Sequence, residues 1–181
     1  MDSSKENAVL TAVGPDRIGL VEKISEFIVQ HDCNIEDSKM AVFCGEFALI
    51  LLISGSPQDL MSTEGASHEL VNLTGLSIAI RRPSAAKSVE PLLPYKLTAS
   101  CMDHPGVVHR LSSLLSSLAI NIESMETKTY SAPVSGTPIF RLEAFISIPA
   151  KLKVNTLRAR FAEIEREENI DIDLVPVEEG G

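Results

Sequence analysis

The chain has 181 residues, 44% of them hydrophobic and 23% charged, and a formal net charge of −9. This length suits one large domain or two small ones, and the composition is typical of a globular protein. A DNA-binding surface needs clustered lysine and arginine, whereas Arg81-Arg82 is the only adjacent basic pair. Tryptophan, which would offer a stacking platform for bases, is absent. We therefore expect no direct binding to nucleic acid.

The cysteines and the apolar segments bear on the cellular compartment. Cys33, Cys44 and Cys101 are too few to form a disulfide framework, and they fit a reducing compartment. The first residues are polar and lack the apolar core of a signal peptide. The longest apolar run, residues 47–53, is too short to cross a bilayer. We expect a cytoplasmic protein that does not enter a membrane.

The sequence repeats itself with a constant offset. A register held without a gap from a strand through a helix into the next strand indicates duplication of one structural unit. Between the copies lies a stretch rich in proline, serine and alanine, which suits neither a strand nor a helix. We predict a first domain over residues 1–83, a linker over 84–94 and a second domain over 95–181. The matching segments, 87 residues apart, are Leu10-Thr11-Ala12 and Leu97-Thr98-Ala99, Asp16 and Asp103, and Asn34-Ile35-Glu36 and Asn121-Ile122-Glu123.

Each copy begins with a strand followed by a helix. In the first copy a short apolar strand over residues 8–13 is broken at Gly14-Pro15-Asp16, where Asp16 is a candidate N-cap. Apolar residues at helical spacing then predict a helix ending near Asp32, and the same stripe in the second copy ends near Ala119.

A hairpin, a second helix and a last strand complete each copy. The first hairpin turns at Cys44-Gly45, and the second has a loop six residues longer. In the first copy Ser56 is the predicted cap of the second helix and Pro57 its first residue, while Gly65 weakens its middle. The last strands are predicted over residues 76–81 and 170–175.

The element order predicts the fold class. Strand, helix, strand, strand, helix, strand, occurring twice, gives an α+β protein of two ferredoxin-like βαββαβ domains. Each would be a four-stranded antiparallel sheet with two helices on one face. In the first copy the third strand, residues 47–53, places apolar side chains on both faces. In the second copy, residues 139–148, the second face carries Arg141, Glu143 and Phe145. We expect the face without helices to pack on another sheet or subunit, so that the protein is a homo-oligomer.

Two loop patterns resemble a known family. The segments 14–19 and 102–106, each following a strand, opening an apolar helix and leading to Asn-Ile, resemble the ACT domain. Residues 135–140, Ser-Gly-Thr-Pro-Ile-Phe, followed by Leu142-Glu143-Ala144, resemble the second half of the glycine cleavage system transcriptional repressor family. The resemblance covers nearly the whole chain. It implies a non-catalytic regulatory protein that binds an amino acid or a related small molecule.

The resemblance also implies candidate ligand-binding residues. A glycine in the strand–helix turn lets the backbone approach a ligand, free N–H groups at the helix start favour a carboxylate, and an asparagine offers donors and acceptors. A purely structural reading stays open, since aspartate caps helices and asparagine forms turns. The first candidate site consists of Asp16, Arg17, Gly19 and Asn34, and the second of Asp103, His104, Gly106 and Asn121.

Signatures of catalysis and of metal binding are missing. The glycines are not spaced as a Rossmann or Walker fingerprint, and the histidines lack ligand spacing with the cysteines. We expect no enzyme activity, no cofactor and no metal. The acylphosphatase fold has the same element order, but Arg17 lacks the glycine-rich frame of a phosphate loop.

The function expected from these observations is regulation. The resemblance implies sensing of a small amino-acid-like ligand, such as glycine or serine, and control of transcription. Because direct DNA binding is not expected, control would pass through a protein partner such as a transcription factor. Two alternatives stay open: an amino-acid-sensing regulatory subunit of a metabolic enzyme, and a tandem ACT scaffold without a ligand.

Overall fold

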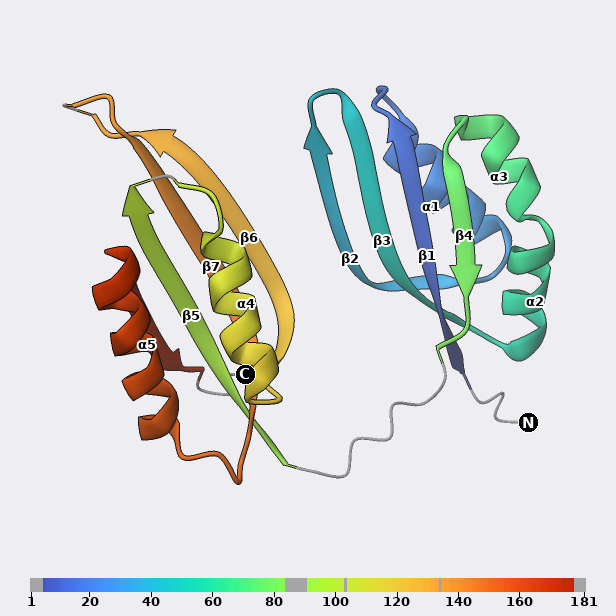
Figure 1. Ribbon diagram of the computed structural model, residues 1–181. Helices are drawn as coiled ribbons and strands as arrows, with labels where there is room; N and C mark the ends of the chain where they lie inside the picture. Colours follow the sequence, from blue (N-terminus) through green and yellow to red (C-terminus); the bar gives the residue numbers. More distant parts are fainter. Residues whose placement is uncertain (1–4, 84–90, 103, 134, 178–181) are drawn as a thin grey trace. The chain divides into compact units, whose positions relative to one another are not determined.

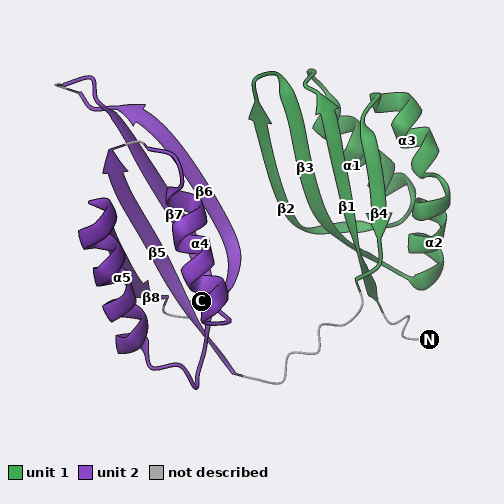
Figure 2. Cartoon of the chain, in the orientation of Figure 1, with its two compact units in different colours: residues 1–87 green, residues 88–181 purple. Residues whose placement is uncertain are grey.

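A computed structural model describes residues 5–83, 91–102, 104–133 and 135–177. The chain divides into two compact units, residues 1–87 and 88–181 (Figure 2). Most of the expected linker lies outside the described residues, and strand β5 begins within its last part, at Leu92.

The first unit contains one antiparallel sheet and three helices. The sheet has the strand order β2-β3-β1-β4, and the helices cover one of its faces (Figure 1). This is the ferredoxin-like arrangement predicted from the element order. The strands are β1 (Glu6–Pro15), β2 (Asn34–Phe43), β3 (Glu46–Gly55) and β4 (Ser77–Arg81), and the helices are α1 (Leu20–Gln30), α2 (Pro57–Gly65) and α3 (Ser67–Thr74).

The second unit repeats this topology with the order β6-β7-β5-β8 and with two helices on one face (Figure 1). The α+β class and the duplication are therefore confirmed. Its strands are β5 (Leu92–Met102), β6 (Asn121–Ser131), β7 (Pro138–Pro149) and β8 (Asp171–Pro176), and its helices are α4 (Val107–Ser117) and α5 (Val154–Glu168).

The core of each unit lies between the sheet and its helices, because strand residues alternate between the two faces. In β1, Ala8, Leu10 and Ala12 are buried beneath the helices, and in β7 every second residue from Phe140 to Ile148 is buried. The intervening residues of each strand form the second face, which we call the open face because no helix of its own unit covers it (Figure 1).

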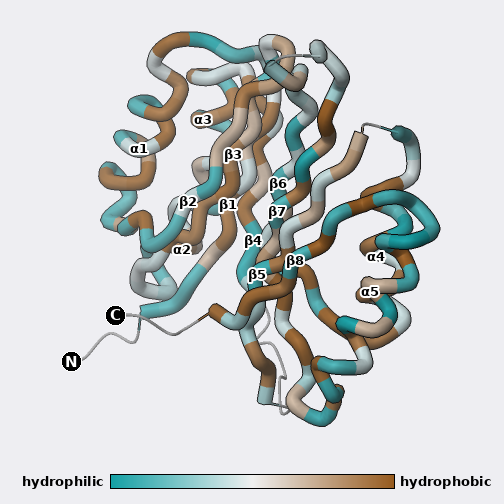
Figure 3. The backbone as a smooth tube through the Cα atoms, turned by 90° about the vertical axis from the view of Figure 1, so that its left-hand side faces the viewer, coloured by the Kyte–Doolittle hydropathy of each residue, from teal (hydrophilic) through white to brown (hydrophobic). Residues whose placement is uncertain are grey.

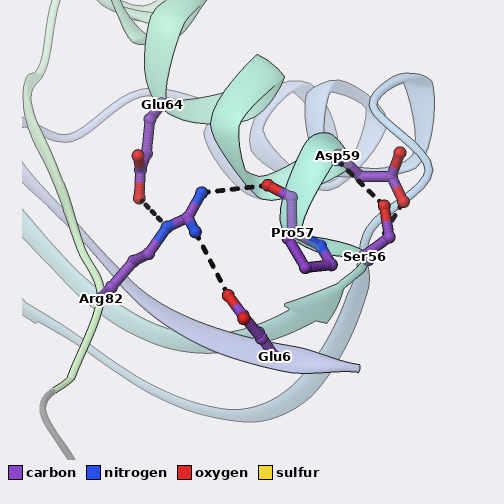
Figure 4. Close-up of polar contacts among 6 residues, drawn as sticks. All are labelled: Glu6, Ser56, Pro57, Asp59, Glu64 and Arg82. Carbon is purple, nitrogen blue, oxygen red and sulfur yellow. Dashed lines mark hydrogen bonds and ion pairs between the residues drawn. The ribbon is translucent and has the colours of Figure 1, made fainter. Parts of the chain in front are cut away.

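The second helix of the first unit begins as predicted but does not continue as one helix. Ser56 accepts a hydrogen bond from the backbone N–H of Asp59 at 3.2 Å, and the Asp59 carboxylate accepts one from the backbone N–H of Ser56 at 3.1 Å (Figure 4). This capping box fixes the start of α2. Gly65 ends α2, since glycine loses the most entropy in a helix, and the chain re-enters a helix at Ser67.

The side chain of Arg82 links three segments of the first unit. Its guanidinium contacts Glu6 at 3.2 Å, Glu64 at 2.9 Å and the carbonyl oxygen of Pro57 at 3.1 Å (Figure 4). One side chain thus joins the residue after β4 to the start of β1 and to α2. Among the residues that the structure describes, no helix is long and apolar enough to span a membrane.

Candidate functional site

The first candidate turn joins β1 to α1 and holds Asp16, Arg17 and Gly19. Gly19 is the N-cap of α1 with φ 90°, and no side chain caps this helix end. The prediction that Asp16 caps the helix was wrong. Asp16 lies outside the helix, where its backbone N–H donates to the carbonyl oxygen of Gly45 at 2.8 Å. A glycine in the left-handed region sets the helix start, and the first amides of α1 stay without a side-chain acceptor.

Arg17 turns away from these amides. Its guanidinium donates a hydrogen bond to the carbonyl oxygen of Thr74, the last residue of α3. The last turn of α3 has no basic residue of its own, so Arg17 supplies the cation that a helix C-terminus favours. Gly75 leaves room for this contact, because a Cβ there would lie 3.0 Å from the Arg17 Nη2. The structure therefore gives Arg17 a partner within its own unit.

Asn34 lies at the start of β2. Its side-chain amide donates to the Glu36 carboxylate at 3.0 Å, and the Ser54 hydroxyl donates to the same oxygen. These two hydrogen bonds, first that of Ser54 and then that of Asn34, lower the pKa of Glu36 below its ordinary value. The asparagine is exposed and orients a carboxylate that stays ionised.

Asn34 and the turn lie at opposite ends of the sheet. Pro15, beside the turn, pairs with Glu46 at the start of β3, whereas Asn34 pairs with Ser54 at its end. At the rise of a β-strand these positions are roughly 26 Å apart. The four residues predicted as one site do not form one site within the unit.

The second unit repeats this arrangement. Gly106 is the N-cap of α4 with φ 102° and no side-chain cap. Asn121 donates from its side chain to Glu123 at 2.8 Å and pairs with Ser147. Met102, beside the turn, pairs with Ile139. Asn121 is thus again far from the turn. Asp103 lies outside the described residues.

His104 occupies the place that Arg17 has in the first unit. Its Nδ1 lies 3.3 Å from the carbonyl oxygen of Pro105, and its Nε2 is buried without a hydrogen-bond partner among the described residues. Within the described ranges, no helix terminus is hydrogen-bonded to this side chain as Thr74 is to Arg17. The turn of the second unit is therefore less engaged with its own unit.

The two helix starts also differ in charge. The first turn of α1 contains Glu22, whose carboxylate oxygen lies 3.6 Å from the position of a Cβ on Gly19. The first turn of α4 has no acidic residue, and a Cβ on Gly106 would meet nothing within 4 Å. The start of α4 thus has space beside Gly106 and no carboxylate in its first turn, which suits an anion better than the start of α1 does.

Comparisons with known proteins agree with this fold. The family model of the ACT domain matches residues 6–76. The glycine cleavage system transcriptional repressor of Escherichia coli is 30% identical over 136 residues, which cover 72% of this chain and 68% of the repressor. The chain belongs to the glycine cleavage system transcriptional repressor family.

Two crystal structures share this fold over nearly the whole chain. An unknown protein from Galdieria sulphuraria is 29% identical, with a TM-score of 0.81, and the match covers 97% of this chain and 100% of that one. A protein provisionally assigned as a glycine cleavage system transcriptional repressor is 23% identical, with a TM-score of 0.69, covering 97% and 99%. The second of these supports the fold alone.

The family assignment makes the chain a regulatory ACT-domain protein. The ACT match covers residues 6–76 of the first unit, and the second unit has the same strand order. In the described parts of the chain, no group of histidine, cysteine, aspartate and glutamate residues could hold a metal ion.

The sequence interpretation missed three partners of the candidate residues, namely Glu36, Glu123 and Thr74. Glu36 and Glu123 accept hydrogen bonds from the asparagine side chains. Their recurrence 87 residues apart in the sequence was a signal for a shared role. The contact of Arg17 with Thr74 joins residues far apart in the chain and had no signal in the sequence.

Proposed function

We propose that this repressor-family chain senses a small amino-acid-like ligand, such as glycine or serine, and regulates transcription through a protein partner. The residues predicted to bind the ligand are those of the strand–helix turns and the two asparagines, and among them we propose the turn that starts α4 as the site. The observation that carries the proposal is the start of α4, where a left-handed glycine, uncapped amides and open space coincide.

The chemistry of this helix start fits a carboxylate. Four backbone N–H groups at a helix N-terminus have no partner within the helix, and the helix dipole favours negative charge there. His104, with an unpartnered buried nitrogen, adjoins the turn. The α1 start is the weaker candidate, because Glu22 is near its amides and Arg17 is bound to α3.

The charge of the protein supports action through a partner. With a net charge of −9 and scattered basic residues, the chain lacks the cation density that releases counterions from DNA. The name of the Escherichia coli relative refers to transcription. A ligand can bias a partner only by binding two arrangements of the protein with different affinity.

The ligand is tested by amide chemical shifts of the full chain during titration with glycine and with serine. We expect the largest shifts at Val107 and Val108, the first amides of α4. Gly106→Ala adds a Cβ and strains the backbone at φ 102°, so binding should weaken at least tenfold. Gly45→Ala is the matched control, because Gly45 also has positive φ and open space, but in the first unit.

Unchanged spectra with every common amino acid, together with a melting temperature that no amino acid raises, would leave a scaffold without a ligand.

The partner is tested by affinity capture from cells after crosslinking. Recovery of a transcription factor supports the proposal, whereas recovery of a metabolic enzyme alone supports an enzyme-regulating subunit. Retention of duplex DNA by the purified chain would refute action through a partner.

A further inference from the structure

The open faces of the two duplicated sheets differ in chemistry. In the first unit, Val13 lies between its cross-strand partners Ala48 and Ser77. In the second unit the same position is Ser100, and its partners are the charged residues Arg141 and Asp171. The fold therefore does not require charge at this row, because one copy forms without it.

The next row shows the same change. Thr11 of the first unit pairs with Ile50 and Ala79, both uncharged. Its counterpart Thr98 pairs with Glu143 and Asp173. In Figure 3, β3 of the first unit is mostly hydrophobic, in keeping with its uncharged residues in these rows.

Charged residues of these two rows line a cavity. A cavity of about 410 Å³ lies against this part of the second unit, and its size is within the range of small-molecule sites. Its lining combines one cation, three carboxylates, a phenol and two small hydroxyls. The residues that provide these groups are Arg141, Glu165, Asp171, Asp173, Tyr130, Ser100 and Thr98.

The charges at and beside this cavity are separated by strand, apart from Glu165 of α5, whose carboxylate accepts a hydrogen bond from the backbone N–H of Ile172 at 2.9 Å. On the β7 side, Glu143 is bound by Arg141 at 2.6 Å and by Lys96 at 3.0 Å, so these three side chains sum to one positive charge. The two cations, Lys96 before Arg141, lower the pKa of Glu143 and keep it ionised. On the β8 side, the backbones of Asp171 and Asp173 pair with β5, and their carboxylates have no hydrogen bond or ion pair with any described residue.

We propose that this cavity on the open face of the second unit binds a small zwitterion, namely a compact α-amino acid. Arg141 receives the carboxylate, and Asp171 and Asp173 receive the ammonium group. Arginine presents five donors in a planar fork that suits a carboxylate, and Glu143 takes up only part of them. The site goes beyond the proposed sensing turn, with which it shares no residue.

The spacing of the strands fits such a ligand. Arg141 and Asp171 flank Ser100 on its two neighbouring strands, so their Cα atoms are about 10 Å apart. Both side chains line the cavity, Arg141 from β7 and Asp171 from β8. The hydroxyl of Ser100 lies beneath the ligand as a further hydrogen-bond partner.

The duplication itself supplies substitutions that the fold accepts. Arg141→Ala, Asp171→Ser and Asp173→Ala each install the residue of the first unit, Ala48, Ser77 and Ala79. Lys128→Ala is the matched control. Lys128 pairs with Arg141 in the same row and corresponds to Ala41, which pairs with Ala48, yet it does not line the cavity.

The test is an amide chemical-shift titration of the full chain with glycine, with acetate and with methylammonium. Glycine should shift the amides of Ser100 and Asp171 and should bind at least tenfold more tightly than either half-ligand. Arg141→Ala and Asp171→Ser should each weaken glycine binding at least tenfold, and Lys128→Ala should change it less than twofold. Arg141→Lys, which keeps the charge but not the fork, should weaken it severalfold, and it replaces Arg141→Ala if that variant unfolds.

The outcomes separate this site from the helix start. The cavity shifts should persist in Gly106→Ala, since that residue is not part of the cavity. The absence of shifts on β5 and β8 with glycine would overturn the site. Equal binding of methylammonium and glycine, or equal loss in Lys128→Ala and Arg141→Ala, would also overturn it.

Discussion

Replacing Arg17 with alanine tests whether this residue belongs to a ligand site or to the scaffold. In the structure its guanidinium donates to the carbonyl oxygen of Thr74 at the end of α3. The substitution leaves this helix end without a cation, because α3 has no basic residue in its last turn. We expect the first unit to lose stability and amino-acid binding to stay unchanged.

The size of this effect follows from the exposure of the contact. A cation near a helix C-terminus contributes about 0.3–1 kcal/mol at an exposed site. A hydrogen bond from a charged donor contributes more when buried, but Arg17 is exposed. We therefore expect a loss of about 1 kcal/mol, which corresponds to a fall in Tm of about 4–8 °C for a domain of this size.

The placement of the tyrosines separates the two units in the assay. The chain has no tryptophan, and both tyrosines, Tyr95 and Tyr130, lie in the second unit. Tyrosine fluorescence during thermal unfolding therefore reports on the second unit, whereas far-UV circular dichroism reports on both. Arg17→Ala should lower the unfolding temperature of the first unit, which dichroism detects. The unfolding temperature measured by fluorescence should stay unchanged.

An unchanged dichroism transition combined with glycine binding weakened tenfold would refute the structural role of Arg17. Arg17→Lys is the control for charge, since it keeps the cation and loses the planar fork. It should recover part of the lost stability. A change in the fluorescence transition would mean that the first unit influences the second, and the assignment of the loss to α3 would then fail.

Three further predictions concern local structure. Ala119 has φ 54°, so Ala119→Gly should stabilise the second unit by about 0.5–1 kcal/mol in the fluorescence transition. Ser56→Ala removes the cap of α2 and should cost about 1 kcal/mol in the dichroism transition alone. Hydrogen bonds lower the pKa of Glu36 in the folded state, so its contribution to stability is present above its unfolded pKa and is lost as pH falls through the lowered value. Asn34→Ala should shift the Glu36 titration upward in an NMR pH series, and an unchanged midpoint would contradict the role of that hydrogen bond.

The elements that were predicted correctly depend on neighbours along the chain. The hairpin turn at Cys44-Gly45 is one example, because both residues have positive φ, as a two-residue turn between strands requires. The cap at Ser56 is another, since its partner Asp59 is three residues away. In both cases all the residues that determine the local structure lie within a few positions of one another in the sequence.

The errors arose where several local solutions compete. Asp16 has the chemistry of a cap, but Gly19 reaches a left-handed conformation at lower cost, so the helix starts later. Gly65 was expected only to weaken a helix, and it ends one. The contact of Arg17 with Thr74 depends on the tertiary fold and could not be predicted from either segment alone.

The location of Asn34 could have been deduced from the predicted topology. A helix that follows a strand and packs on its sheet returns the chain to the other end of that strand. The next strand must then start far from the turn, as Asn34 and Asn121 do. The motif match grouped the asparagines with the strand–helix turns, although the predicted order of elements places them at opposite ends of the sheet.

The duplication distinguishes the residues that build the fold from those available for recognition. Both units have a left-handed glycine before the first helix, a left-handed residue after it, Asp32 or Ala119, and a register shift shortly after the asparagine. These shared features concern the backbone, and the fold needs them in either copy. The open faces share no such requirement, because Val13 and Ala48 serve in one copy where Ser100 and Arg141 stand in the other. Charges that the scaffold can lack are therefore the first place to look for what the second unit recognises.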